Sequence, residues 1–250
     1  FSGLRGAETS QELQEIAQEI IPALTSHSNT IRFNQDLFAK IETVYNQKDE
    51  LNLDNEQIIL VEKIYDDFAR NGAALPDEKR NKLKELNERI SVISLQLGEN
   101  LLADNNAFKL VIEDESDLAG LPENVINAAA EEAKKNEMEG KWLFTLAKPS
   151  WIPFVQFSEK RDLREKILLA YVNRGNNNDE NDNKKLFVEL ISLRQQVAKL
   201  LGYNNYAEYF ISQQMAETPE NVYDFLLTVW EPALERAKTE RDELQEIMKK

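Results

Sequence analysis

Apolar residues recur at intervals of three and four along most of this 250-residue chain, and this spacing constrains the fold more than any other feature. It is the spacing of one face of an α-helix, which turns once about every 3.6 residues. The clearest example follows Pro76, at Leu83, Leu86, Ile90, Ile93, Leu97 and Leu101. The sequence therefore predicts a mainly α fold, an elongated bundle of helices and hairpins in which this helix pairs with its neighbour.

Capping residues and helix breakers divide the pattern into further helices. The first pattern covers about Ser10–Lys48 and is expected to break near His27–Thr30, where Ser, Asn and Thr compete with the helix. Asp54 is a predicted N-cap with a glutamine at the capping-box position, and Asn71-Gly72 ends the helix that it starts. Further helices are expected at about 122–137, 158–174, 184–201, 206–214 and from 218 onward, the last with a kink or restart at Pro232.

One stretch, residues 141–165, departs from this pattern. It holds five large aromatic side chains and two prolines: Trp142, Phe144, Trp151, Phe154, Phe157, Pro149 and Pro153. Residues 142–146 and the β-branched stretch 108–112 are predicted to form one small antiparallel β element, with Trp142, Phe144 and Leu146 on one face. The later aromatics are interpreted as a turn that packs this element onto the helix capped by Ser158. We therefore expect Trp142 and Trp151 to be largely buried.

Composition excludes several classes of function. The net charge is −15, and no dense cluster of Lys and Arg is present, so a nucleic-acid partner is not expected. No apolar run reaches the roughly 18 residues of a membrane span, so no membrane partner is expected. The first 16 residues show no signal-peptide pattern. With no cysteine, disulfides and thiolate chemistry are excluded.

The common catalytic motifs are also missing. The chain has one histidine, His27, and a HExxH zinc site needs two. No GxSxG, GxxxxGK[ST] or GxGxxG motif occurs. The acidic side chains on predicted helix faces are interpreted as solvated surface: Glu12, Glu15 and Glu19, then Glu235 and Glu243. The acidic run EDESD (113–117) is interpreted as a turn. His27 is interpreted as a surface or capping residue.

Five stretches nevertheless occur in the order and spacing of one enzyme family. They are DLAGLPENV (117–125), WLFTLAKPSWIPFVQFSEKRDLREKI (142–167), YVNRG (171–175), LRQQVAKLLGY (193–203) and MAETPENVYDFL (215–226). They resemble the zinc metallopeptidases of the thimet oligopeptidase and peptidyl-dipeptidase family. The closing stretch, WEPALERAKTERDELQ (230–245), is most similar to the peptidyl-dipeptidase Dcp branch.

The resemblance implies an almost entirely helical, two-lobed peptidase with a deep, narrow channel for short peptides. In that family a zinc-bound water attacks the peptide carbonyl, and the glutamate of a HExxH motif acts as general base. The motif belongs to a later part of such sequences and is absent here. We therefore assign no catalytic and no metal-binding residue to this chain, expect it to bind no cofactor itself, and leave its substrate-binding residues unassigned.

The expected organisation is one helical fragment, residues 1–250, from the N-terminal region of a larger two-lobed peptidase. Its parts are helical hairpins (1–106), a small β and aromatic junction (107–157) and a helical wall (158–250). The lack of an initiator Met at Phe1 and of a stop signal at Lys250 favours a fragment.

The predicted function is the non-catalytic N-terminal part of a zinc-dependent peptidyl-dipeptidase or oligopeptidase, forming one wall of the substrate channel. The alternative is a stand-alone helical scaffold or interaction protein without peptidase activity. The expected partners are short peptide substrates and the C-terminal catalytic half of the parent, which would carry the zinc. The expected compartment is the cytoplasm, with periplasmic or other export as the alternative.

Overall fold

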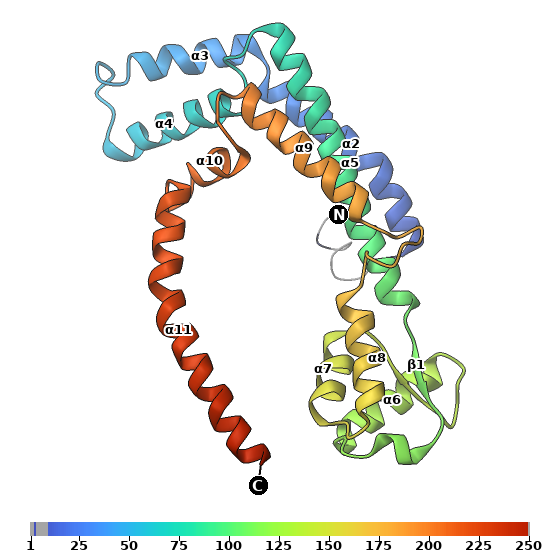
Figure 1. Ribbon diagram of the computed structural model, residues 1–250. Helices are drawn as coiled ribbons and strands as arrows, with labels where there is room; N and C mark the ends of the chain where they lie inside the picture. Colours follow the sequence, from blue (N-terminus) through green and yellow to red (C-terminus); the bar gives the residue numbers. More distant parts are fainter. Residues whose placement is uncertain (1–2, 4–9, 250) are drawn as a thin grey trace. The chain divides into compact units, whose positions relative to one another are not determined.

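The structure, a computed structural model, describes residues 3 and 10–249. What the sequence predicted for residues 1–2, 4–9 and 250 lies outside the described residues. Within them, ten α-helices and one two-stranded sheet confirm the prediction of a mainly α fold (Figure 1). The α-helices are α2 (Gln11–Arg32), α3 (Gln35–Asn46), α4 (Asn55–Arg70), α5 (Asp77–Ala107), α6 (Glu123–Lys135), α7 (Lys148–Phe157), α8 (Arg161–Val172), α9 (Lys184–Leu200), α10 (Tyr206–Ile211) and α11 (Pro219–Met248).

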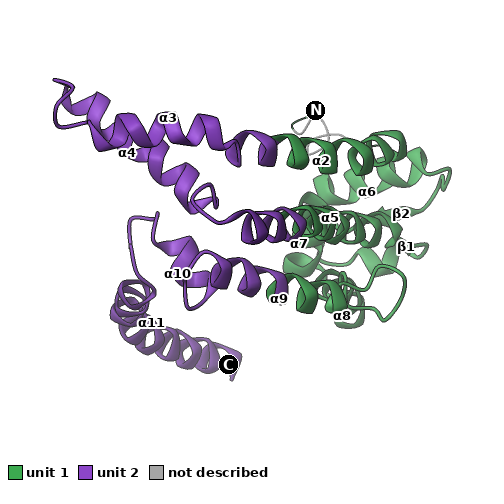
Figure 2. Ribbon diagram, turned by 90° about the horizontal axis from the view of Figure 1, so that it is seen from above, with its two compact units in different colours: residues 1–27, 87–191 green, residues 28–86, 192–250 purple. Residues whose placement is uncertain are grey.

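The chain divides into two compact units (Figure 2). Unit 1 comprises the described residues of 1–27 and 87–191, and unit 2 those of 28–86 and 192–250. Each unit is therefore assembled from two separate stretches of sequence. The three-part division at residues 106 and 157 stays a prediction.

Helix boundaries follow the capping residues more closely than the helix propensities. Asp54 and Gln57 exchange the two hydrogen bonds of a capping box at the start of α4, as predicted. The break expected near His27–Thr30 is wrong, because α2 continues to Arg32. Propensity differences among polar residues are well below about 1 kcal/mol each and do not stop a helix on their own. The chain turns instead at Asn34, whose side chain accepts a hydrogen bond from the Leu37 N–H and caps α3.

The small sheet of unit 1 forms as predicted, with strands β1 (Leu110–Ile112) and β2 (Trp142–Phe144). They pair antiparallel, with Leu110 opposite Phe144 and Ile112 opposite Trp142. A short 3-10 helix, Glu115–Leu118, follows β1. Helices α6, α7 and α8 pack with the sheet around one apolar core. The buried members of that core are Leu110, Ile112, Leu118, Leu121, Val125, Ala129, Phe144, Leu146, Phe154 and Ile167.

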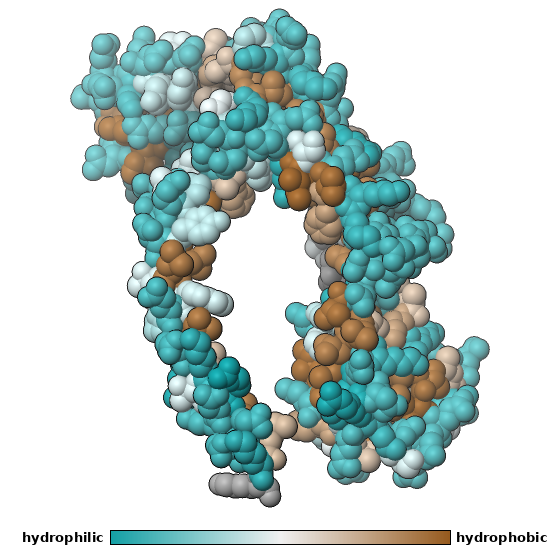
Figure 3. All heavy atoms as spheres, viewed as in Figure 1, coloured by the Kyte–Doolittle hydropathy of each residue, from teal (hydrophilic) through white to brown (hydrophobic). Residues whose placement is uncertain are grey.

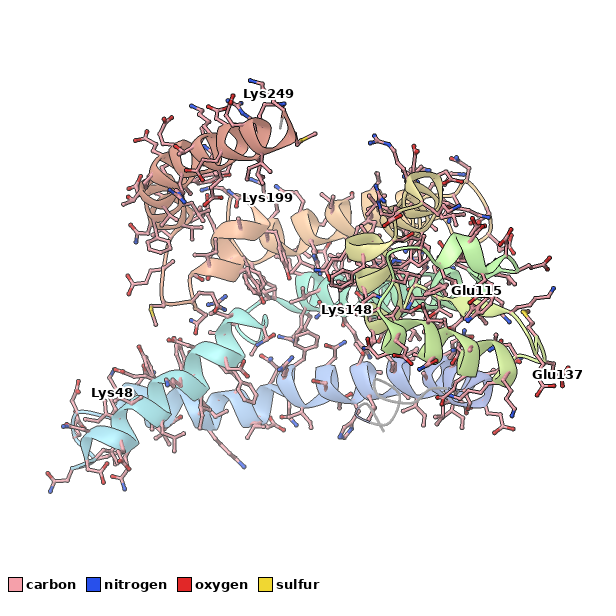
Figure 4. The ribbon with its side chains drawn as sticks, turned by 90° about the horizontal axis from the view of Figure 1, so that it is seen from below. Lys48, Glu115, Glu137, Lys148, Lys199 and Lys249 are labelled. Carbon is pink, nitrogen blue, oxygen red and sulfur yellow. The ribbon has the colours of Figure 1, made fainter. Side chains whose placement is uncertain are left out.

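In unit 2, α3 and α4 form a helical hairpin. Phe38 is buried between them, with its ring centroid 5.8 Å from that of Tyr65 and 6.5 Å from that of Phe68. Lys48 lies at the end of the hairpin (Figure 4) and pairs with Glu62.

Helix α5 finds its partner elsewhere than predicted. Within unit 1 it lies against α2, and the Gln18 Nε2 donates to Glu99 Oε2 over 3.1 Å. Within unit 1, α5 therefore has a neighbouring helix that lies far away in the sequence. The last helix, α11, continues through Pro232 without restarting.

Candidate functional site

The residues that carry metal or acid–base chemistry in other enzymes lie apart on the surface. His27 is exposed on α2. The acidic faces Glu12, Glu15, Glu19 and Glu235, Glu243 are exposed as well, as interpreted from the sequence. Among residues 3 and 10–249, no three His, Cys, Asp or Glu side chains gather closely enough to hold a metal ion. The donors present do not fit a zinc ion, so no chemical step is derived through one.

The aromatic stretch builds the core of unit 1 rather than a cofactor site. Phe144 and Phe154 are fully buried and meet edge to face, with ring centroids 4.6 Å apart. The segment predicted as a turn is helix α7, with Pro149 in its first turn, where proline is tolerated because no helical N–H bond is needed there. Phe157, at the end of α7, stays 49% exposed and does not join this core.

The two tryptophans of this stretch are mostly buried, as predicted, but neither is among the fully buried residues of the core. Both pack against the rim of the core. Trp151 stacks on Tyr171 of α8 at a centroid distance of 4.1 Å, and the Arg174 guanidinium lies 3.8 Å from the Tyr171 ring.

The connection between α7 and α8 is tied to the segment after β1. The Glu159 N–H donates to the Ala119 carbonyl over 2.9 Å, and Gly120 takes the left-handed φ of +86° beside it. The Arg164 side chain donates to the Ser158 carbonyl and so braces the backbone of this connection. Ser158 ends α7, whereas α8 begins at Arg161, so the predicted cap lies one element earlier.

A small cleft of about 200 Å³ opens between α6, β2 and the start of α7. Its lining is mostly apolar. Glu132 supplies its charged group but is engaged by Asn136 and Lys135, and the Ser150 Oγ accepts from the Thr145 N–H. Acyl or glycosyl transfer would need a nucleophile next to a free base. The residues that line this cleft do not provide such a pair.

The asparagine-rich loop 173–183 is hydrogen-bonded on its inner side to one buried carboxylate. Asp104 on α5 is 8% exposed. Its Oδ2 accepts from the Gly175 N–H (2.7 Å) and the Asn177 Nδ2 (2.9 Å), and its Oδ1 from the Asn181 Nδ2 (3.0 Å). The inner side of this loop is therefore hydrogen-bonded to the protein rather than solvated. Three donors from one loop converge on one acceptor group, and each is worth more because that group is charged.

The end of the same loop is buried. Asn183 is 2% exposed, donates to the Leu97 carbonyl (3.1 Å) and accepts from the Asn100 Nδ2 (2.8 Å). The neighbouring Asp182 is only partly exposed, and hydrogen bonds from the Lys184 side chain and backbone lower its pKa to about 2. The loop is thus a structural clamp between α5 and α9 within unit 1.

Unit 2 contains an arginine–tyrosine cluster that the sequence did not reveal. The Arg70 guanidinium lies 5.0 Å from the Tyr209 ring and donates to the Tyr209 carbonyl. Arg194 lies 5.2 Å from the Tyr206 ring. Burial raises the pKa of Tyr209. These cation–π contacts fix the short helix α10 to α4 and α9.

Large apolar side chains remain uncovered on both units. In unit 1 one group lies on α8 and the first half of α9: Leu168, Leu169, Val172, Phe187, Val188 and Ile191. In unit 2 one group lies on α11, which has no buried residue, and brown side chains line its earlier part in Figure 3. Contiguous exposed apolar surface of this kind is typical of a site that contacts another protein segment.

Comparison with known proteins relates this chain to one family of peptidases. Residues 154–250 match the profile described as Peptidase family M3. The chain is related to peptidase family M3. Over 100% of its length it is 35% identical to a dipeptidyl carboxypeptidase of Escherichia coli. It is also 34% identical to an oligopeptidase A of Haemophilus influenzae over 98% of its length, and 27% identical to a thimet-like oligopeptidase of Dictyostelium discoideum over 99%.

The predicted resemblance is thereby confirmed. The M3 relatives are longer, however, and this chain spans only 37%, 36% and 36% of the three named above. The relatedness covers the β element, the aromatic core and the exposed helices alike. It assigns no catalytic residue to the 250 positions of this chain.

Within the described residues, no helix is both long and apolar enough to cross a lipid bilayer.

Proposed function

We propose that this chain is a non-catalytic, N-terminal part of a zinc-dependent peptidyl-dipeptidase or oligopeptidase and forms one wall of its substrate channel. One observation carries the proposal. The whole chain aligns with M3 peptidases, yet it spans little more than a third of their length and holds one exposed histidine and no cysteine.

The fold supports a wall better than a catalytic centre. Long helices that are clamped at their ends by the Asp104 loop and the Arg70 cluster form stiff, extended surfaces. Polar and apolar side chains exposed on such surfaces can line a passage for an unfolded peptide. The catalytic zinc and its ligands would then belong to the remaining region of the parent.

The test compares the 250-residue chain with the longer protein encoded by its reading frame. Both are assayed with a short peptide that carries a fluorophore and a quencher, and both are analysed for bound zinc. We expect the longer protein to cleave the peptide with about one zinc bound, and to lose activity with a chelator and regain it with added zinc. The 250-residue chain is expected to show neither activity nor stoichiometric zinc.

Two results would contradict the proposal. Chelator-sensitive cleavage by the 250-residue chain alone would place the catalytic centre inside it. A longer protein that binds no zinc and cleaves no peptide would favour the helical scaffold instead. A matched control is the His27→Gln variant of the longer protein, which removes an exposed imidazole and is expected to keep full activity.

The cytoplasmic location belongs to the same proposal, with export as the alternative. Cell fractionation with a tag at the end of the longer protein distinguishes the two.

A further inference from the structure

Helix α11 presents a large uncovered apolar surface in unit 2. Its 30 residues include none that is buried. Tyr223 and Phe225 are 68% exposed, Trp230 is 60% exposed, and Leu226 and Leu227 are 53% and 55% exposed. Aromatic side chains bury about 150–250 Å² each, so the three aromatics alone expose on the order of 400 Å². Surfaces of that size on soluble proteins are commonly interaction sites.

The apolar side chains of the first half of α11 form a broad face. Successive helical residues are rotated by about 100°, so runs of neighbouring apolar positions widen an apolar stripe. Residues 222–234 hold such runs, at Val222, Tyr223, Phe225, Leu226, Leu227, Val229, Trp230, Ala233 and Leu234. Asp224, Thr228 and Glu231 share the remaining side of the helix. The apolar face is wider than the stripe that a single facing helix covers, so this segment needs more than one helix to cover it.

The second half of α11 is charged rather than apolar, and its charges indicate which kind of partner can cover the first half. It carries surface ion pairs, among them Arg236–Glu240 and Lys238–Glu235. Acidic residues outnumber basic ones along the helix, which disfavours an anionic lipid surface. The apolar segment therefore fits a protein partner better than a membrane.

We propose that the broad apolar face of residues 222–234 of α11 docks onto the remaining part of the longer polypeptide and is covered by it. This inference rests on the function proposed above. The M3 match includes all of α11, and well over half of each named relative lies outside the region aligned with this chain. That region is long enough to supply several enclosing helices.

The chain has no cysteine, so a single introduced thiol reports on one position. The test variants are Leu227→Cys, inside the proposed surface, and Glu240→Cys, on the charged half of the same helix. The two positions match in exposure, at 55% for Leu227 and 56% for the Glu240 side chain. Maleimide labelling rates are measured for each variant in the 250-residue chain and in the longer protein, and the labelled peptide is identified by mass spectrometry.

We expect similar labelling rates at both positions in the 250-residue chain. In the longer protein, labelling at Leu227→Cys should slow at least ~100-fold, because it then requires local opening, while Glu240→Cys changes less than ~3-fold. If Leu227→Cys does not fold, Tyr223→Cys replaces it, at a position that is 68% exposed.

Unchanged labelling of Leu227→Cys in the longer protein would overturn the inference. Protection that already appears in the 250-residue chain and grows with its concentration would overturn it too, in favour of a second copy. Peptide cleavage is measured on the same samples. If the longer protein is protected from labelling but inactive, the docking inference stands and the proposed function is contradicted. If it is active but unprotected, the proposed function stands and the docking inference is contradicted.

Discussion

Gly120 offers the sharpest test of how unit 1 is assembled. An added Cβ at this position would lie 2.3 Å from the Phe157 carbonyl oxygen and 3.1 Å from the Glu159 backbone nitrogen. Both atoms belong to backbone, so they move only if the connection between α7 and α8 moves. Gly140 has nearly the same φ, +84° against +86°, but a Cβ there would meet no atom within 4 Å. Gly140→Ala therefore measures the backbone cost alone.

The expected magnitudes follow from that difference. Alanine in the left-handed region costs about 1–2 kcal/mol, partly offset by the lower entropy of the unfolded chain. Gly140→Ala should thus lower the free energy of unfolding by about 1 kcal/mol. Gly120→Ala adds a steric cost of about 1–3 kcal/mol and weakens the hydrogen bond between Ala119 and Glu159, so we expect a loss of about 2–4 kcal/mol.

The measurement is urea unfolding of the 250-residue chain, followed by tryptophan fluorescence. Replacing Trp230 by Phe in all samples leaves Trp142 and Trp151, which both pack against the core of unit 1. Equal losses for the two glycine variants would refute the close approach between Gly120 and the α7–α8 connection. A loss confined to Gly140→Ala would refute the reasoning altogether.

Three further predictions concern the same unit. Phe154→Ala should lower the free energy of unfolding by about 3–5 kcal/mol, because this side chain is fully buried. Phe157→Ala should lower it by less than about 1 kcal/mol, because this side chain is 49% exposed. Similar losses for the two variants would contradict the described core. Asp104→Ala removes the acceptor of three loop donors and should cost about 3 kcal/mol, with faster amide exchange across 173–183; unchanged exchange would show that the loop is held otherwise. Asp182 has a pKa lowered from 3.8 to about 2, so its contribution to stability is complete above about pH 4 and is lost as the pH falls toward 2. NMR titration should show this pKa return toward 3.8 in Lys184→Gln, and no movement would mean that Lys184 is not the cause.

The sequence allowed accurate prediction where the cause is local. The capping box at Asp54, the strand pair around Phe144 and the limits of most helices depend on neighbouring residues, whose hydrogen bonds and periodicity are visible in the sequence. The turn expected at residues 149–157 failed for a local reason as well, because the first proline starts a helix as readily as it ends one. The contacts of the candidate site could not be predicted from the sequence. Nothing near Asp104 in the sequence indicates its role, because its hydrogen-bond partners lie about seventy residues later in the chain.

The sequence by itself determined the class of the fold, the small sheet and the relation to M3 peptidases, since periodicity, capping and ordered motifs are properties of short stretches. Only the tertiary structure decided which apolar stripes are covered. It buries the stripe of α5 at Leu83, Leu86 and Ile93 and leaves that of α11 exposed, although both stripes have the same spacing. Burial depends on which distant element supplies the opposing surface, and a helical period specifies a face without specifying its partner.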